Sequence, residues 1–182
     1  MTHWTFRPIT RADFPLMAGW LQQPHVARWW ADDPSPETLE TDYGGTVDGT
    51  EPSEVFIALH DGAAAGLVQR YRLAAYPEYV RALGRLLPLP EEAWSMDYLV
   101  DAAFVGQGSA MLRAFVAALW RDRPEATCLL VPVHQGNRAS CRALEKCGFE
   151  CVMAGELEPD NPTDSKDHFV YRLDGPGFVQ SS

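Results

Sequence analysis

The sequence predicts an α/β (α+β) domain, a mixed central sheet flanked by helices, because strand-like and helical segments alternate along it. An apolar, strand-like run at 94–100 is followed by a glycine turn and then by a helical run at 111–120. The same order returns downstream, where a buried strand expected at 126–133 precedes a helix at 137–148 with an Asn cap and a terminal Gly. This alternation is typical of helices packed on a sheet.

Each of the other expected elements is bounded by a turn former or a capping residue. Thr10 and Asp13 have the spacing of a capping box, and Asp61-Gly62 is typical of a tight hairpin turn. In chain order, the sequence predicts a strand at 4–9, a helix from Thr10 to Leu21, a short helix at 25–30, a helical turn or two at 37–43, a hairpin of strands 54–59 and 63–73, a strand ending at 153 and a last strand at 169–173.

Residues 74–92 mix tyrosines, leucines and prolines between two predicted central strands. We expect this insertion to form a substrate flap at the mouth of the sheet. At 182 residues the chain is long enough for one core and short for two. The expected domain therefore spans 1–175, followed by a loose tail at 176–182.

Composition narrows the class of protein. No apolar run approaches the ~20 residues of a membrane span, and the first residues lack the apolar segment of a signal peptide, so we expect a cytoplasmic protein with no membrane partner. The net charge of −10 argues against a nucleic-acid partner. The four cysteines form no CxxC pair, which indicates reduced, mostly buried thiols and no metal site.

The most informative motif is the glycine turn Val105-Gly106-Gln107-Gly108-Ser109-Ala110. It joins a strand to a helix, an arrangement that presents free backbone N–H groups at a helix N-terminus to an anionic ligand. Because Gly106 and Gly108 have no Cβ, the main chain is free to approach such a ligand closely. Taken alone, the motif also fits a tight turn that binds nothing.

With the segments after it, this turn resembles the acyl-CoA-binding half of the GCN5-related N-acetyltransferase (GNAT) superfamily. The resemblance rests on an acidic strand, the glycine turn and helix, a further strand, and a helix from Asn137 that ends in Glu-Lys-Cys-Gly-Phe at 145–149. The segments His-Val-Ala-Arg-Trp-Trp at 25–30 and Met-Asp-Tyr-Leu-Val at 96–100 are similar to parts of aminoglycoside 6′-N-acetyltransferases and siderophore-type lysine acyltransferases. The resemblance covers roughly residues 5–173.

The resemblance implies the GNAT fold, a mixed sheet of about six to seven strands that is splayed where acyl-CoA binds, with acetyl-CoA as co-substrate. Backbone N–H groups of 106–110 would hold the pyrophosphate, and a strand amide near Leu99 or Val100 would polarise the thioester carbonyl. The positions implied for the cofactor are Leu99, Val100, Val105, Gly106, Gln107, Gly108, Ser109, Ala110, Asn137 and Ser140.

Amine acetylation needs a neutral nitrogen, and a lysine-like amine with a pKa of about 10.4 is protonated at pH 7. The resemblance places Asp97 beside the acyl thioester, as a base or as an ammonium anchor. Many family members carry a tyrosine seven residues after the Asn cap to protonate the CoA thiolate, but here that position is Leu144. Tyr98, Ser140 or solvent would then supply the proton. Pro132 is a second departure, since the aminoglycoside enzymes have an aspartate there.

The acceptor cleft implied by the resemblance is acidic and partly aromatic. Trp30 would offer an apolar or cation–π wall. The excess acid of the chain has two explanations, an acidic cleft or solubility alone, and Asp32 and Asp33 equally fit a solvated turn. The candidates for substrate binding are Trp30, Asp32, Asp33, Asp97, Asp164 and Asp167.

The expected function is direct transfer of an acetyl group from acetyl-CoA to a primary amine of a cationic small molecule, with an aminoglycoside 6′-amine as first choice. Acylation of a lysine or hydroxylysine side chain in siderophore synthesis is the alternative within the family. A non-catalytic acyl-CoA-binding or sensor protein is the alternative of another class, favoured by Leu144 and Pro132. The expected oligomeric state is a monomer or a homodimer.

Overall fold

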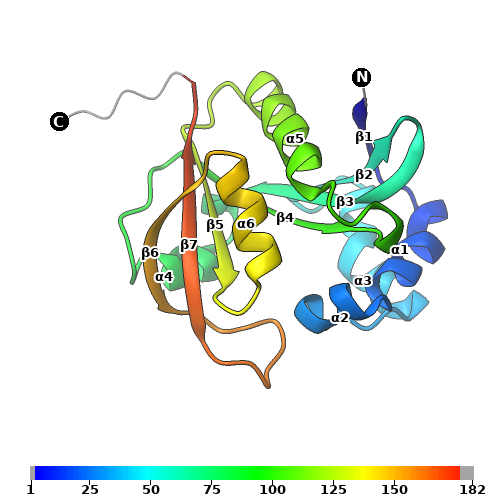
Figure 1. The fold of residues 1–182 in the computed structure, drawn as a ribbon, viewed down its shortest axis with the longest axis horizontal. Helices are drawn as coiled ribbons and strands as arrows, with labels where there is room; N and C mark the ends of the chain where they lie inside the picture. The colour runs from blue at the N-terminus through cyan, green and yellow to red at the C-terminus, as the bar shows by residue number, and fades with distance from the viewer. Residues whose placement is uncertain (1–2, 177–182) are drawn as a thin grey trace.

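The computed structural model describes residues 3–176, which form a seven-stranded mixed sheet in the order β1-β2-β3-β4-β5-β7-β6. The strands are β1 (Trp4–Pro8), β2 (Glu54–His60), β3 (Ala63–Arg72), β4 (Ala93–Val100), β5 (Cys128–His134), β6 (Glu150–Glu156) and β7 (Asp167–Asp174). The helices are α1 (Phe14–Leu21), α2 (Pro24–Trp30), α3 (Pro36–Val47), α4 (Pro77–Leu83), α5 (Gly108–Asp122) and α6 (Arg138–Lys146), with 3₁₀ turns η1 (Arg11–Asp13), η2 (Leu73–Ala75) and η3 (Ala102–Phe104). Figure 1 shows α5 and α6 in front of the sheet, α4 behind it and α1 to α3 gathered at one side.

Three apolar clusters join the helices to the sheet. On one face, α5 packs through positions at helical spacing, which are Met111, Leu112, Phe115, Val116 and Leu119. On the other face, Trp20 of α1 and Leu39 of α3 pack on β2 and β3, while Leu83 of α4 packs on β5 and β7. The sheet is therefore covered on both faces, as the alternation of strands and helices predicted.

The sheet is splayed between β4 and β5. These strands are parallel and pair only at Ala93–Cys128 and Trp94–Leu129, whereas the other neighbouring strands are antiparallel and pair at five positions or more. Beyond Trp94 the two strands diverge, which leaves backbone groups of β4 free to bind a ligand. The expected mixed sheet with a splay is confirmed, and the splay positions the site described below.

Most of the expected elements are confirmed, with shifted ends. In the hairpin turn, Asp61 (φ 48°) and Gly62 (φ 85°) both adopt the left-handed region, which matches the twist of the flanking strands. The helix expected as a turn or two at 37–43 is longer and runs from Pro36 to Val47, with Ser35 capping its first turn. Strand β6 also exceeds its expected length, because it pairs with β7 along most of its course.

The insertion at 74–92 forms η2 and α4 and contributes a wall of the central cavity. Its Leu86 packs against β6 at Gly155, where a Cβ would come within 2.5 Å of the leucine side chain.

Of the expected tail, residues 177–182 lie outside the described residues. No helix in the described range is long and apolar enough to cross a bilayer. Two of the four cysteines are fully buried, namely Cys128 and Cys141, while Cys147 is half-buried and Cys151 exposed.

Candidate active site

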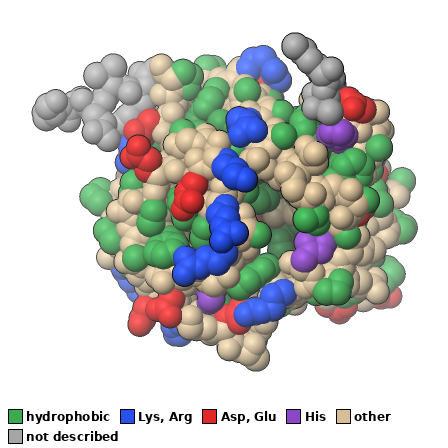
Figure 2. All heavy atoms as spheres, in the orientation of Figure 1, with side chains coloured by type: hydrophobic (Ala, Val, Ile, Leu, Met, Phe, Trp, Pro, Cys, Tyr) green, Lys and Arg blue, Asp and Glu red, His purple; other side chains and the backbone are tan. Residues whose placement is uncertain are grey.

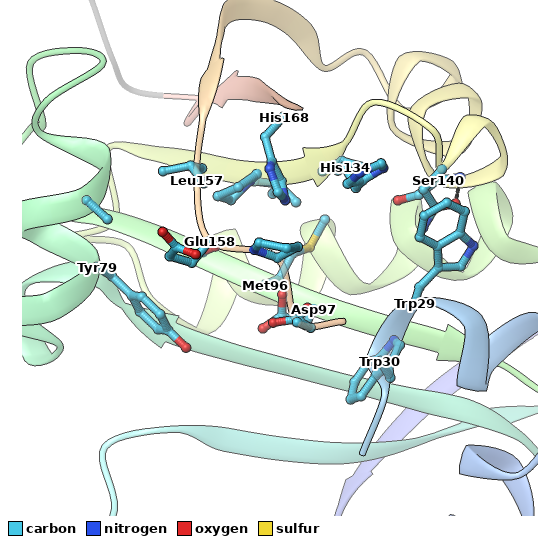
Figure 3. Close-up of a pocket in the computed structure, with 18 of the residues that line it drawn as sticks. Trp29, Trp30, Tyr79, Met96, Asp97, His134, Ser140, Leu157, Glu158 and His168 are labelled. Carbon is cyan, nitrogen blue, oxygen red and sulfur yellow. Dashed lines mark hydrogen bonds between the residues drawn. The ribbon is translucent and has the colours of Figure 1, made fainter. Parts of the chain in front are cut away.

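The splay between β4 and β5 opens into a cavity of about 570 Å³. Its walls come from α2 to α4, from β3, β4, β5 and β7, from the loop 157–164 and from the first turn of α6. Among the described residues that line it none is Lys or Arg, whereas six are carboxylates: Asp32, Glu78, Asp97, Glu158, Asp160 and Asp164. Trp29, Trp30 and Tyr79 add aromatic walls around Asp97 (Figure 3). Such a cavity favours a cationic ligand.

Asp97 lies on β4 inside this cavity (Figure 3). It faces Gln69 directly across the β3–β4 pair, and Gln69 Nε2 donates a hydrogen bond of 2.7 Å to Asp97 Oδ2. Burial, helped by the charge of Asp160, raises the pKa of Asp97, while hydrogen bonds from Gln69 and Tyr71 oppose the rise. A half-buried carboxylate held by a neutral amide is suited to bind an ammonium group or to take its proton.

Asp32 and Asp160 share the cavity, and neither has an ion-pair partner in the described part of the chain. Burial raises the pKa of Asp32 to about 6, and neighbouring carboxylates add to the rise. Burial also raises the pKa of Asp160. Asp164 differs, because Arg28 Nη1 donates to it at 2.7 Å and lowers its pKa. Glu158 also has an ion-pair partner, Lys166, so the negative charge left for a ligand centres on Asp32, Glu78, Asp97 and Asp160.

We expect the affinity for a cationic amine to fall as the pH drops through 6. Asp32 attracts an ammonium group only when ionised, and with a pKa of about 6 its ionised fraction falls about tenfold between pH 8 and pH 5. KM for the amine, measured across this range, is expected to rise less steeply in Asp32→Asn than in the wild type. The same slope in both proteins would show that Asp32 does not bind the amine.

Tyr98 and Ser140 form a hydroxyl pair where β4 meets the first turn of α6. Tyr98 Oη lies 2.6 Å from Ser140 Oγ. The Ser140 backbone N–H donates to Asn137 Oδ1, which caps α6 as the sequence predicted. Burial raises the pKa of Tyr98, so its hydroxyl stays protonated at neutral pH. A protonated phenol beside the splay is suited to donate a proton to a leaving thiolate.

Leu144→Tyr is expected to lower the free energy of unfolding by about 1–3 kcal/mol, because a larger side chain must enter a filled core. Leu144 is 0% exposed in the cluster that α5 and α6 form on the sheet. Denaturant unfolding measures the loss, and Leu144→Met, which conserves volume, is the control with a cost below about 1.5 kcal/mol. A Leu144→Tyr protein of unchanged stability and higher kcat would instead indicate that the new hydroxyl reaches the thiolate.

The glycine turn leads into α5 as expected. Gly106 has a φ of 95°, a conformation that favours glycine. Within the described residues, the backbone N–H groups of Gly106, Gly108 and Ser109 have no hydrogen-bond acceptor, whereas that of Ala110 donates to Gln107 O. Three free donors at the positive end of a helix form a site for an anion such as a pyrophosphate.

Basic side chains lie on the same side of the sheet as this turn. Figure 2 shows Lys and Arg side chains in a band over α6. The exposed basic residues of α5 and α6 are Arg113, Arg121, Arg138, Arg142 and Lys146. Arg113 also joins the two helices, since it donates to Lys146 O at 3.0 Å. Charge is thus divided between a basic surface over α5 and α6 and an acidic cavity, which suits an anionic cofactor and a cationic acceptor.

The structure brings some of the other acceptor candidates to the cavity and leaves others outside it. Trp30 and Asp164 line the cavity. Asp33 lies outside it, and its carboxylate accepts from the Ser35 N–H at the start of α3. Asp167 does not line the cavity either, because it is the exposed first residue of β7. Of the two adjacent acids after α2, only Asp32 therefore faces a ligand.

The remaining cofactor candidates lie at the end of β4 and around the glycine turn. The Leu99 side chain is buried under α1 to α3, so only its backbone is placed at the splay. Val100 O accepts from His25 Nε2 at 2.8 Å, which holds α2 to the end of β4. The Val105 side chain is 67% exposed, and Gln107 stands at the N-cap of α5.

Several cavity residues were missed by the sequence analysis. Gln69 carries no motif, Tyr79 was expected only as part of the insertion at 74–92, and Asp160 was not singled out within its acidic loop. His134 and His168 also line the cavity from β5 and β7. Gln69 is the cross-strand partner of Asp97, and only the register of β3 and β4 identifies it. The Asp61-Gly62 hairpin turn joins β2 to β3 and does not set that register.

Comparison with known proteins agrees with this geometry. The family model described as an acetyltransferase (GNAT) domain matches residues 10–157. The aminoglycoside N(6′)-acetyltransferase type 1 of Klebsiella pneumoniae is 26% identical over 170 residues, which cover 87% of this chain and 79% of that protein. The crystal structure of the aminoglycoside acetyltransferase AAC(6′)-Ib with coenzyme A superposes with a TM-score of 0.78 at 23% identity, covering 94% of this chain and 95% of that one. Its complex with paromomycin and acetyl-CoA gives a TM-score of 0.77, also at 23% identity, over 94% and 93% of the two chains.

The fold and the site define an acyl-CoA-dependent transferase. The chain belongs to the acetyltransferase (GNAT) domain family, and it is an acetyl-CoA-dependent N-acetyltransferase with acetyl-CoA as co-substrate. The family resemblance found in the sequence is thereby confirmed.

Proposed function

We propose that this enzyme acetylates a primary amine of a cationic small molecule, and that the acceptor is an aminoglycoside 6′-amine. The cavity carries the proposal, because six carboxylates and no Lys or Arg are found among its described lining residues. An aminoglycoside bears several ammonium groups, which such a surface attracts over its whole width. The relatives named as aminoglycoside N(6′)-acetyltransferases support the same acceptor.

In the proposed complex, acetyl-CoA crosses the sheet at the splay. Its pyrophosphate would be held by the free N–H groups of Gly106, Gly108 and Ser109. Its thioester carbonyl would be polarised by a backbone amide near Leu99 or Val100, where β4 has diverged from β5. The acetyl group would then meet the amine in the acidic cavity.

The proposed reaction is a direct attack of the amine nitrogen on the thioester carbonyl. Asp97 would hold the ammonium group or take its proton, and Tyr98 would protonate the departing CoA thiolate. Burial raises the pKa values of three of the thiols, which keeps them protonated and poorly nucleophilic, as found for Cys128, Cys141 and Cys147. A covalent acyl-cysteine step is therefore not part of the proposal.

CoA-thiol release across matched acceptors tests the proposed function. Neomycin carries a 6′-amine, and paromomycin carries a hydroxyl at that position with an otherwise matching skeleton. We expect turnover with neomycin and at least about a hundredfold lower rate with paromomycin, since the reacting nitrogen is missing. Equal rates with both would place the acetyl group on another amine. Turnover with lysine or hydroxylysine derivatives alone would favour siderophore chemistry, and acetyl-CoA binding without any turnover would favour a sensor.

A further inference from the structure

Two histidines of the cavity wall differ in how their ring nitrogens are used. His134 of β5 and His168 of β7 are paired across the two strands, with ring centroids 5.4 Å apart. Figure 3 shows both on the cavity wall formed by β5 and β7, with Asp97 on β4 across from them. Neither histidine has a place in the mechanism proposed so far.

The hydrogen bonds of His134 occupy both of its ring nitrogens. Its Nδ1 accepts from the Gly136 N–H at 3.0 Å, and its Nε2 lies 3.1 Å from Ser165 O. A carbonyl oxygen only accepts, so the proton of a neutral His134 is on Nε2. His134 therefore has no lone pair left for a substrate.

His168 has the opposite tautomer. Its Nδ1 lies 2.8 Å from Lys166 O, so the proton of the neutral ring is on Nδ1 and donates to that carbonyl. Nε2 then keeps its lone pair, and within residues 3–176 it has no hydrogen-bond partner. The side chain is buried, at 8% exposure, and it lines the cavity. Among the described residues that line the cavity, Nε2 of His168 is thus the one imidazole nitrogen with a free lone pair, and the contact of Nδ1 with Lys166 O fixes the ring.

Strand alternation places His168 and Asp97 on the same face of the sheet. Tyr71 and Val170 belong to one apolar cluster on the α4 side. Asp97 shares that side because its partner Gln69 is two residues from Tyr71, and His168 shares it because it is two residues from Val170. The two groups therefore lie on opposite sides of the splay, Asp97 on β4 at its edge and His168 on β7, which pairs with β5 across from it.

The surroundings keep His168 neutral at pH 7. Burial lowers the pKa of His168 below its ordinary value, and His134 acts in the same direction, against the Lys166 carbonyl and the charge of Asp167. The ionisable side chains that act on the ring are His134 on β5 and Asp167 on β7. The cavity that the ring lines also holds the carboxylates Asp32, Glu78, Asp97, Glu158, Asp160 and Asp164.

We propose that His168 is a catalytic residue that takes the proton of the attacking amine at Nε2, while Asp97 on the opposite arm of the splay anchors the substrate's positive charge. This inference rests on the proposed amine acetylation. The substrate ammonium first loses a proton to solvent, and the neutral nitrogen then forms a bond to the thioester carbonyl carbon, the carbon–sulfur bond breaks, and the nitrogen passes a second proton to Nε2 of His168. The CoA thiolate takes a proton from Tyr98. As the amide leaves, His168 returns its proton to solvent and Tyr98 takes one back from solvent.

NMR of ¹⁵N-histidine-labelled protein tests the tautomers directly, without a substrate. We expect the Nδ1–H form for His168 and the Nε2–H form for His134, which serves as an internal reference. A proton on Nε2 of His168 in the neutral ring would overturn the proposal, because that nitrogen would then be unable to act as a base.

Kinetics with neomycin test the role itself. His168→Asn keeps a donor for Lys166 O and removes the base, so we expect kcat/KM to fall about 10²-fold or more, with acetyl-CoA affinity and melting temperature unchanged. The wild-type rate is expected to rise with pH through the His168 pKa below 6.5, and His168→Asn to lose that limb. Added imidazole is expected to restore part of the rate of His168→Ala.

The two proposals fail in different ways. If the wild type turns over neomycin and folded His168→Asn matches it at every pH, the role of His168 is refuted while the proposed function stands. If the wild type acetylates no amine, the proposed function falls, and the role of His168 falls with it.

Discussion

Asp97→Asn is expected to lower kcat/KM for the amine by about 10²-fold or more, the range for loss of a general base or of a charged anchor. The substitution keeps the shape of the side chain, and Gln69, which now donates to Asp97 at 2.7 Å, is still able to donate to the new amide oxygen. Only the negative charge disappears from the cavity. Initial rates of CoA-thiol release with neomycin, across a range of amine concentrations, measure the effect.

Asp97→Asn changes only the part of the site that binds the amine. We therefore expect its acetyl-CoA affinity, measured by titration, to stay within about twofold of the wild type. Glu125→Gln is the matched control, because it removes one carboxylate from an exposed position outside the cavity. We expect that variant to keep near-normal turnover. Near-normal turnover of folded Asp97→Asn would reduce Asp97 to a structural residue of β4.

Gly108→Asp is expected to weaken acetyl-CoA binding by well over tenfold. At about 4 Å and an effective dielectric constant near 20, two like charges repel by roughly 4 kcal/mol, and about 1.4 kcal/mol already corresponds to a factor of ten. The new carboxylate would stand at the free N–H groups of Gly108 and Ser109, where the pyrophosphate is proposed to bind. Titration with acetyl-CoA and with CoA measures the dissociation constants.

Gly108→Asn is the control that separates charge from shape. A Cβ at Gly108 would meet only Val100 Cγ2, at the ordinary distance of 3.6 Å, so both variants are expected to fold with near wild-type melting temperatures. The neutral side chain is expected to cost less affinity than the charged one. Unchanged acetyl-CoA affinity in folded Gly108→Asp would contradict the proposal that the pyrophosphate binds at this turn.

The cofactor side of the site could be predicted from the sequence because its determinants are local. The glycine turn, the Asn137 cap and the apolar face of α5 each depend on residues within a few positions of one another. All three occur in the structure at the expected places. Asp97 was found through the family resemblance, which places the strand before the glycine turn beside the acyl thioester.

The acceptor side of the site could not be predicted from the sequence, because its residues are far apart in the chain and only the fold brings them together. Asp32 and Asp33 are neighbours in the sequence, yet one lines the cavity and the other accepts hydrogen bonds at the start of α3. Asp160 comes to the cavity from a loop between β6 and β7, and nothing in its local sequence separates it from the acids around it.

The sequence by itself determined the α/β alternation, the hairpin, the glycine turn and the capped helix, since backbone preferences and apolar spacing act over short distances. Only the tertiary structure decided that β4 and β5 diverge after two residue pairs, that Gln69 faces Asp97, and that His168 lines the same cavity with its Nδ1 held by Lys166 O. The physical reason is strand register and pairing, which bring together residues far apart in the chain and set the face on which each side chain lies.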